Sequence, residues 1–181
     1  KEQEEFERVK NRLHQICTKA KEIQVPILID AEESWIQNAI DQLAEDMMKN
    51  YNQDSVIVYN TVQLYRWDKL DYIKSMHKKA QKENFKLGLK LVRGAYMEKE
   101  RIRAKSQNYR SPIHIRKSDC DNDYNHAIQY CMDNLNDMAL CFGTHNEIST
   151  QLVIQAMKDK NISNSDKKIY FSQLLGMSDN I

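Results

Sequence analysis

One lysine lies inside an otherwise apolar segment, FKLGLKLVRGAY at residues 85–96. Leucines at 87, 89 and 91 recur at the two-residue period of a β-strand, so Lys90 lies in a predicted strand. A buried ammonium is costly unless it is paired or kept near water. Lys90 therefore suggests either a structural ion pair with Asp30 or Glu32, or an amine that forms a Schiff base, as in aldolase-type barrels.

Polar residues also occur near the carboxyl ends of the other predicted strands. A (β/α)₈ barrel gathers all its strand ends around one mouth, whereas an open doubly wound sheet concentrates them at a single switch point. No G-x-G-x-x-G segment follows any strand, and we therefore predict a TIM-like (β/α)₈ barrel. The strand-end residues are Asp30 with Glu32, Gln63, Lys90 with Arg93, His145 with Asn146, and Gln173.

Strand and helix patterns alternate along the chain, as in parallel βα units of the α/β class. Predicted helices cover 6–23, a segment starting near Ser34, 70–80, 124–135 and 148–157, and a long connection with a short helical start covers 97–121. Predicted strands lie in 25–32, 55–64, 85–96, 138–146 and 167–175. A complete barrel typically needs about 250 residues. We expect a single domain over 1–181, truncated at both ends and holding about five central βα units.

The composition excludes several classes of function. The 181 residues are 41% hydrophobic and 29% charged, with a net charge of +1, so no global field attracts nucleic acid. No apolar run approaches the roughly 20 residues of a spanning helix, and no signal peptide is visible. The four cysteines show no disulfide or C-x-x-C spacing and indicate an intracellular protein with reduced thiols. His114, Cys120 and His126 match no common zinc spacing, so no metal site is predicted.

Five blocks of sequence, in order, resemble the proline dehydrogenase family from about Val25 to Ile181: ILIDAEES, YNTVQLYRW, KLVRGAYMEKER, THNE and FSQLLGMSDN. The resemblance implies a distorted barrel with FAD at its mouth. It also implies oxidation of L-proline to Δ1-pyrroline-5-carboxylate by hydride transfer to flavin N5, with electrons passed to a membrane quinone. The resemblance also implies a protein that associates peripherally with a membrane. Its expected compartment is the cytoplasm or, in a eukaryote, the mitochondrial matrix.

The same resemblance implies roles for residues that touch the reaction. Lys90 matches a cation that contacts the flavin, and Tyr96 matches a tyrosine beside the substrate. Asp30 matches a strand-end aspartate that orients its neighbours. Leu91 matches a leucine in contact with the substrate ring, although simple core packing is the alternative from the pattern alone. The segment after the fifth strand is expected to line the pocket with Leu174 and Leu175.

The expected cofactor contacts come from four strand ends. Gln63 resembles a glutamine that hydrogen-bonds the flavin pyrimidine, where an amide offers both a donor and an acceptor. Arg93 is expected to contact phosphate or a loop. The remaining expected contacts to FAD are Gly94, Ala95, Thr144, His145, Asn146 and Gln173, together with Lys90.

Two other functions stay open from the sequence. One is a flavin-free lyase or aldolase that uses Lys90 as an imine-forming amine, and the other is a catalytically inactive barrel kept as a binding module. The family's carboxylate-binding arginines are expected beyond residue 181, so this chain alone is expected to oxidise proline undetectably.

Overall fold

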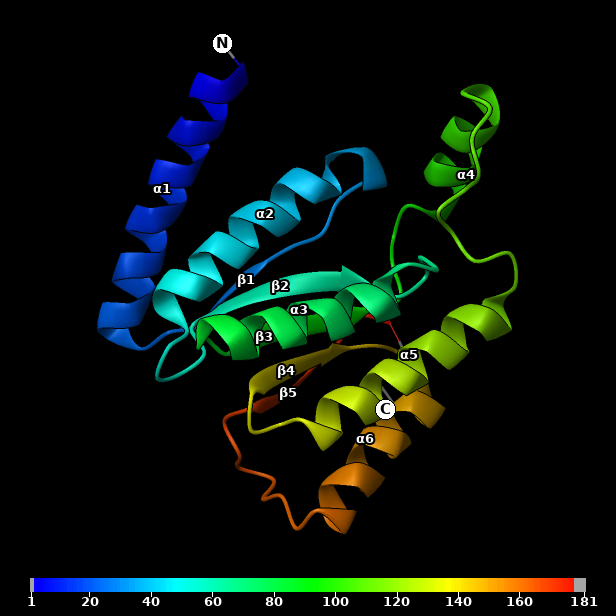
Figure 1. Ribbon diagram of the computed structural model, residues 1–181. Helices are drawn as coiled ribbons and strands as arrows, with labels where there is room; N and C mark the ends of the chain where they lie inside the picture. Colours follow the sequence, from blue (N-terminus) through cyan, green and yellow to red (C-terminus); the bar gives the residue numbers. More distant parts are fainter. Residues whose placement is uncertain (1, 178–181) are drawn as a thin grey trace.

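Five parallel strands form one curled sheet in sequential order, the arrangement of a partial barrel (Figure 1). The structure is a computed structural model that describes residues 2–177. A doubly wound sheet would reverse its strand order at a switch point, and this one does not. The predicted barrel-type α/β fold is therefore confirmed. The strands are β1 (Ile27–Ile29), β2 (Val58–Gln63), β3 (Leu87–Val92), β4 (Met138–Gly143) and β5 (Ile169–Ser172).

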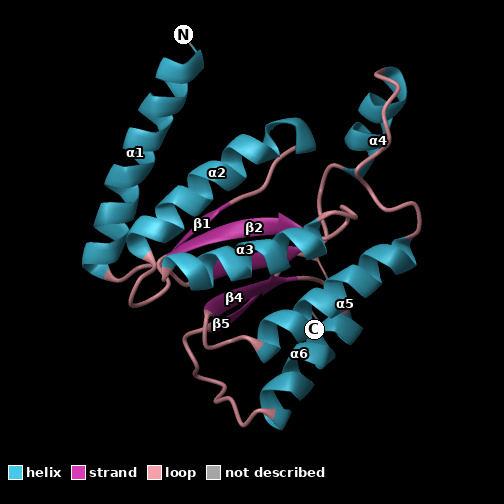
Figure 2. Ribbon diagram, in the orientation of Figure 1, coloured by secondary structure: helices cyan, strands magenta, loops and turns pink. Residues whose placement is uncertain are grey.

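Helices cover the outer face of the sheet, and one further helix lies apart from them (Figures 1 and 2). Helix α4 (Met97–Ser106) lies beyond the carboxyl ends of the strands. The short helical start predicted after residue 97 is confirmed. The other helices are α1 (Glu2–Ile23), α2 (Ser34–Tyr51), α3 (Lys69–Glu83), α5 (Lys117–Asp133) and α6 (Glu147–Asp159).

The core lies between the outer face of the sheet and the helices. Alternate strand residues such as Val62, Leu89 and Phe142 are buried there, at 1% exposure each. Tyr124 of α5 is fully buried among them, and its hydroxyl donates to the carbonyl of Leu91 at 3.1 Å. Since side chains alternate between the two faces of a strand, the residues between these core positions must point to the concave inner face.

The strand register brings the inner-face residues to the same level. Thr61 pairs with Lys90, Lys90 with Cys141, and Cys141 with Tyr170. Two residues further toward the carboxyl ends, which is the next inward-facing position, Gln63 pairs with Val92 and Gly143 pairs with Ser172. Parallel pairing in register therefore places polar side chains from several strands at one end of the concave face.

Helix α5 begins earlier than the sequence predicted. It starts at Lys117, within the segment 97–121 that we expected to be a connection. The first turns carry no apolar period, but they are supported by ion pairs of Arg116 with Asp119 and of Lys117 with Asp121. Such pairs stabilise a helix without leaving a hydrophobic signal.

Among residues 2–177, none of the helices combines the length and the apolar character that spanning a membrane requires.

Candidate active site

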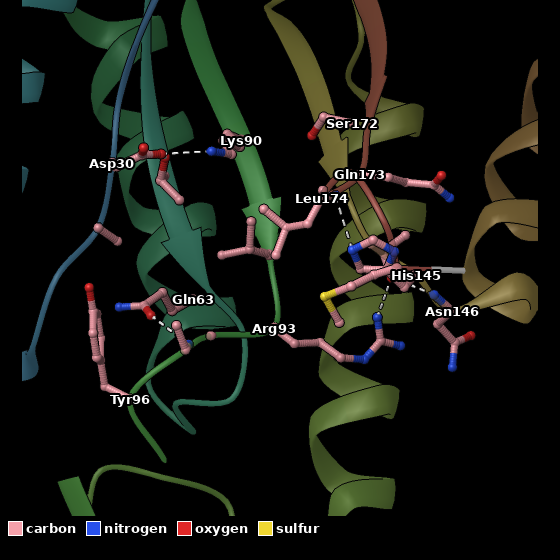
Figure 3. A pocket seen from close by; sticks show the side chains of 18 of the residues that line it. Asp30, Gln63, Lys90, Arg93, Tyr96, His145, Asn146, Ser172, Gln173 and Leu174 are labelled. Atoms are coloured by element: carbon pink, nitrogen blue, oxygen red, sulfur yellow. Dashed lines mark hydrogen bonds and ion pairs between the residues drawn. The ribbon is translucent and has the colours of Figure 1, made fainter. Parts of the chain in front are cut away.

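A cavity of about 810 Å³ opens at the carboxyl end of the strands, a volume typical of ligand pockets. Side chains from the ends of all five strands point toward it (Figure 3). All predicted site residues except Leu91 and Leu175 line it: Asp30, Gln63, Lys90, Arg93, Gly94, Ala95, Tyr96, Thr144, His145, Asn146, Gln173 and Leu174.

Lys90 projects into this cavity and forms an ion pair with Asp30. The two atoms, Nζ and Oδ1, are 2.7 Å apart, and Thr61 donates to the same carboxylate oxygen at 3.3 Å (Figure 3). The Lys90 side chain is 22% exposed and that of Asp30 is 69% exposed. The structural pair considered from the sequence therefore exists. It keeps an enclosed cation at the mouth without burying the carboxylate, and so avoids most of the desolvation cost.

Glu32 joins three elements at one side of the mouth. Its carboxylate accepts a hydrogen bond from the Tyr96 hydroxyl at 2.7 Å, and this bond raises the pKa of Tyr96 above its ordinary value. Its carbonyl accepts from Gln63 Nε2 at 2.7 Å, and its amide N–H donates to Gln37 Oε1 at 2.9 Å. Sequence reasoning noted Glu32 only as a partner for Lys90 and missed its contact with Tyr96.

Gln63 keeps part of its hydrogen-bonding capacity. Its Nε2 donates to Glu32, and its Oε1 accepts from the Ala95 N–H at 3.4 Å. A primary amide has two N–H groups and two lone pairs, so one of each is left for a ligand.

Arg93 ties four elements together behind the cavity. It donates to Asp121 of α5 at 2.8 Å, to Thr144 after β4 at 2.7 Å and to Ser149 of α6 at 3.0 Å. Its guanidinium also lies 4.4 Å from the centroid of the Tyr124 ring. Burial raises the pKa of Asp121, but the hydrogen bonds from Lys117 and Arg93 outweigh it and leave this pKa below the ordinary value. Arg93 thus lines the cavity, but its N–H groups donate to residues of the neighbouring elements and hold these elements together.

His145 and Asn146 connect the end of β4 to the segments beside it. His145 Nε2 accepts from the Leu174 N–H at 3.1 Å, while Asn146 caps α6 by accepting from the Ser149 N–H at 3.0 Å. With Nε2 as the acceptor, the proton of a neutral ring lies on Nδ1. Within residues 2–177 that buried Nδ1 has no hydrogen-bond partner. This nitrogen belongs to a residue that lines the cavity, and it is free to donate a hydrogen bond to water or to a ligand.

The structure places two predicted substrate contacts elsewhere. Leu91 is fully buried in the core between sheet and helices, since it lies one residue from Lys90 and thus on the opposite face. Leu175 is fully exposed and does not line the cavity. Neither leucine lines the cavity, and the position of Leu91 agrees with the core packing that its pattern alone favoured. The two-residue alternation of a strand, counted from Lys90 and from Gln63, would have identified Val92 and Thr61 as lining residues. The remaining lining residues that the sequence prediction did not assign are Ala31, Glu32, Lys117, Gly143, Ser172 and Met177.

Gly94 has a backbone conformation that requires glycine. Its φ is +135°, and a Cβ there would lie 2.6 Å from atoms of the Tyr65 ring. Any side chain would therefore push the loop off Tyr65. The close contact holds the Gly94–Ala95 backbone against the wall of the cavity.

A curled sheet of parallel strands with amide, imidazole and ammonium groups at one mouth has the architecture of the (β/α)-barrel class. Comparison with known sequences identifies the family within this class. The proline dehydrogenase family matches residues 1–181, and the chain belongs to this family. The predicted resemblance is confirmed.

Two relatives illustrate the relationship. Proline dehydrogenase 1, mitochondrial, of Drosophila melanogaster is 37% identical over 191 residues, which cover 100% of this chain and 28% of the fly protein. Proline dehydrogenase 1, mitochondrial, of Arabidopsis thaliana is 39% identical, over 98% of this chain and 37% of the plant protein. The chain thus spans about a third of the length of these relatives.

A solved structure shares the fold. Proline utilization A from Bdellovibrio bacteriovorus, inactivated by N-propargylglycine, superposes with a TM-score of 0.87. The two sequences are 22% identical, and the match covers 97% of this chain and 18% of that protein. At this identity, the likeness supports the barrel-type fold alone.

Proposed function

We propose that this protein acts as an FAD-dependent proline dehydrogenase, which oxidises L-proline to Δ1-pyrroline-5-carboxylate. Family membership and the names of the relatives support the reaction. The observation that carries it is the convergence of Lys90, Gln63 and His145 on one cavity. These three side chains offer a cation, an amide edge and an imidazole N–H to one ligand.

The residues present fit a flavin. The buried Nδ1 of His145 lacks a partner within residues 2–177, and Gln63 has one free N–H and one free lone pair to meet the imide edge of the ring. Gly94 lets the backbone lie against the Tyr65 ring, so that the Gly94–Ala95 backbone forms part of the cavity lining. When bound, the flavin supplies the acceptor for the hydride that leaves proline, and a nearby cation such as Lys90 favours its reduced form.

The chain contributes binding, orientation and exclusion of water. Asp30 holds the Lys90 ammonium at the mouth, and Tyr96 supplies a ring wall that is itself held by Glu32. Val92 and Leu174 add apolar surface to the lining. Loss of hydride from the Cδ of proline forms a C=N bond only when the ring nitrogen has a free lone pair, so the substrate reacts as its neutral amine. Asp30 is already engaged by Lys90 and Thr61, which suits an orienting role.

We extend the proposal to the electron acceptor and the setting. A membrane quinone is the proposed oxidant of the reduced cofactor, reached by peripheral association with the membrane. The relatives are named as mitochondrial, which supports the mitochondrial matrix as the compartment if the source is eukaryotic.

The lyase alternative is less well supported by the geometry. Attack on a carbonyl requires a neutral amine. Lys90 instead donates to a carboxylate at 2.7 Å, an arrangement typical of a charged ammonium. An inactive binding module is less well supported, because the polar residues that the family resemblance assigns to the cofactor all line the cavity.

Anaerobic mixing of the purified, intact, FAD-loaded protein with L-proline tests the proposal, because residues 1–181 alone are expected to oxidise proline undetectably. The visible flavin band is expected to bleach, and o-aminobenzaldehyde should trap the cyclic imine product. Glycine, which cannot form a cyclic imine, serves as the control. Borohydride trapping of a substrate on Lys90 without bleaching would support the lyase, and neither signal would support the binding module.

A further inference from the structure

Helix α2 begins without a cap of its own. The Glu33 side chain at the N-cap makes no capping hydrogen bond, and the first turn contains no acidic residue. The free N–H groups and the dipole of a helix start favour a nearby anion. In this protein the anion comes from α4: Glu100 Oε1 accepts from the Ser34 N–H at 2.5 Å, and Oε2 accepts from the Ser34 hydroxyl at 2.7 Å.

Glu100 has unusual surroundings for a carboxylate. It is fully buried, and within residues 2–177 no lysine, arginine or histidine forms an ion pair with it. A buried charge needs compensation by hydrogen bonds or opposite charge. The start of α2 supplies two hydrogen bonds and the positive end of the helix dipole. These interactions compensate the buried charge of Glu100.

Two neighbouring contacts fasten α4 to the same turn of α2. Lys99 forms an ion pair with Glu33, and the Arg103 guanidinium lies 4.4 Å from the centroid of the Trp35 ring. Three consecutive residues at the start of α2 are thus each bound by a residue of α4.

The two segments that these contacts join also contain Tyr96 and Glu32, which line one side of the cavity mouth. Tyr96 is the N-cap residue of α4, and its carbonyl accepts from the Glu100 N–H at 2.9 Å. Glu32 lies two residues before Ser34 and accepts from the Tyr96 hydroxyl. We propose that Glu100 is a positioning residue that locks α4 to the start of α2 and so holds Tyr96 against Glu32. The bearing of this contact on proline oxidation rests on the proposed function, whereas the contact itself does not.

The substitution Glu100→Gln tests this role. It removes the negative charge that the start of α2 favours, whereas the amide can still bond the Ser34 N–H and hydroxyl, since a hydroxyl also accepts. The loss of charge should loosen α4, and Tyr96 should leave Glu32. The bond to Glu32 is the main cause of the raised pKa of Tyr96, followed by burial and by the charges of Glu32, Glu33 and Asp30. Lys99 Nζ lies 5.8 Å from the centroid of the Tyr96 ring. We expect the substitution to remove half or more of the upward shift in the pKa of Tyr96.

The titration can be followed by ¹⁹F NMR of the chain labelled with 3-fluorotyrosine, with Tyr96→Phe used to assign the signal. Ser34→Ala keeps the backbone N–H but loses the hydroxyl, and should give a smaller shift in the same direction. The matched control is Glu98→Gln, because Glu98 is an exposed acid in the same helix. A second readout is Trp35 fluorescence in a Trp67→Phe background, which should move in Glu100→Gln and stay unchanged in Glu98→Gln.

An unchanged Tyr96 midpoint in Glu100→Gln, with circular dichroism showing an intact fold, would overturn the inference. If Glu100→Gln does not fold, Ser34→Ala decides by the same criterion. No flavin or substrate is needed for these measurements. A shifted Tyr96 titration, together with an intact, FAD-loaded protein that does not oxidise proline, would therefore reject the proposed function and support the positioning role.

Discussion

At the scale of single residues, the most informative feature is Lys90. An ammonium on a barrel strand is stable here because Asp30 pairs with it and is itself open to solvent. The ion pair therefore keeps a positive charge at the mouth at small desolvation cost. In the proposed oxidation, this cation would lie where negative charge develops, and it would stabilise mainly the transition state and the reduced product because it needs no reorganisation.

We expect Lys90→Met to lower kcat of the holoenzyme for proline by about 10²-fold or more, since a preorganised charged donor is lost. The midpoint potential of the bound flavin should also fall, because the reduced form loses a stabilising cation. Anaerobic single-turnover mixing and a redox titration measure the two effects. Lys86→Met is the matched control: it lies at the other end of β3 and donates to the Asp54 carbonyl at 2.8 Å. Equal losses in both variants would contradict the assignment.

At the scale of elements, Arg93 determines how the strand ends are held. One side chain at the end of β3 binds α5, the segment after β4, and α6. A planar guanidinium can serve these partners at once because its donors are arranged in a fixed fork. The position of Thr144, and with it His145, thus depends on a residue of the neighbouring strand.

Replacing Arg93 should destabilise the fold as well as the site. Arg93→Met leaves Asp121 without one cationic partner and removes three hydrogen bonds, so we expect the free energy of unfolding to fall by about 2–4 kcal/mol. Arg93→Lys keeps the charge but not the fork, and should lose about half as much. Urea unfolding measures both values. Arg116→Met, at an exposed pair with Asp119, should lower the free energy of unfolding only slightly, because an exposed ion pair contributes little. A similarly small loss in Arg93→Met would show that its contacts contribute little to stability.

At the scale of the whole molecule, several carboxylates with lowered pKa values link separate parts of the fold. The pKa of Asp137, just before β4, is lowered chiefly by the hydrogen bond from His77 of α3, with a further bond from Gln81. In Asp121, burial raises the pKa, but the donors Lys117 and Arg93 lower it by more. Because these folded-state values lie below the unfolded ones, the unfolded chain binds more protons in acid, and stability is lost as the pH falls.

We therefore expect the stability difference between the unsubstituted protein and Asp121→Asn to be largest near pH 7. It should shrink once the pH falls below the ordinary carboxyl value of about 3.9 and through the folded-state pKa. Urea unfolding at several pH values measures this difference. Asp71→Asn, at an exposed position of α3, controls for the loss of one acidic charge. A difference that stays constant from pH 7 to strongly acid solution would contradict the assigned link to Arg93 and Lys117.

Most of the site could be predicted before the fold was known. Parallel strands place their carboxyl ends at one edge, so the polar residues after each strand had to meet if the strands were recognised. Asp30, Gln63, Lys90 and His145 do line one cavity. The start of α5 could not be predicted in the same way, because ion pairs rather than an apolar period support its first turns.

The sequence by itself determined the strands, their parallel order and the family, because these depend on local periodicity and on short motifs. Only the tertiary structure decided between the pocket and the core for Leu91, for which the sequence left both open. A shift of one residue exchanges the two faces of a strand, and this shift separates the buried Leu91 from the lining Val92. The contact of Glu100 with Ser34 joins residues 66 positions apart, a distance over which no local pattern carries information about packing.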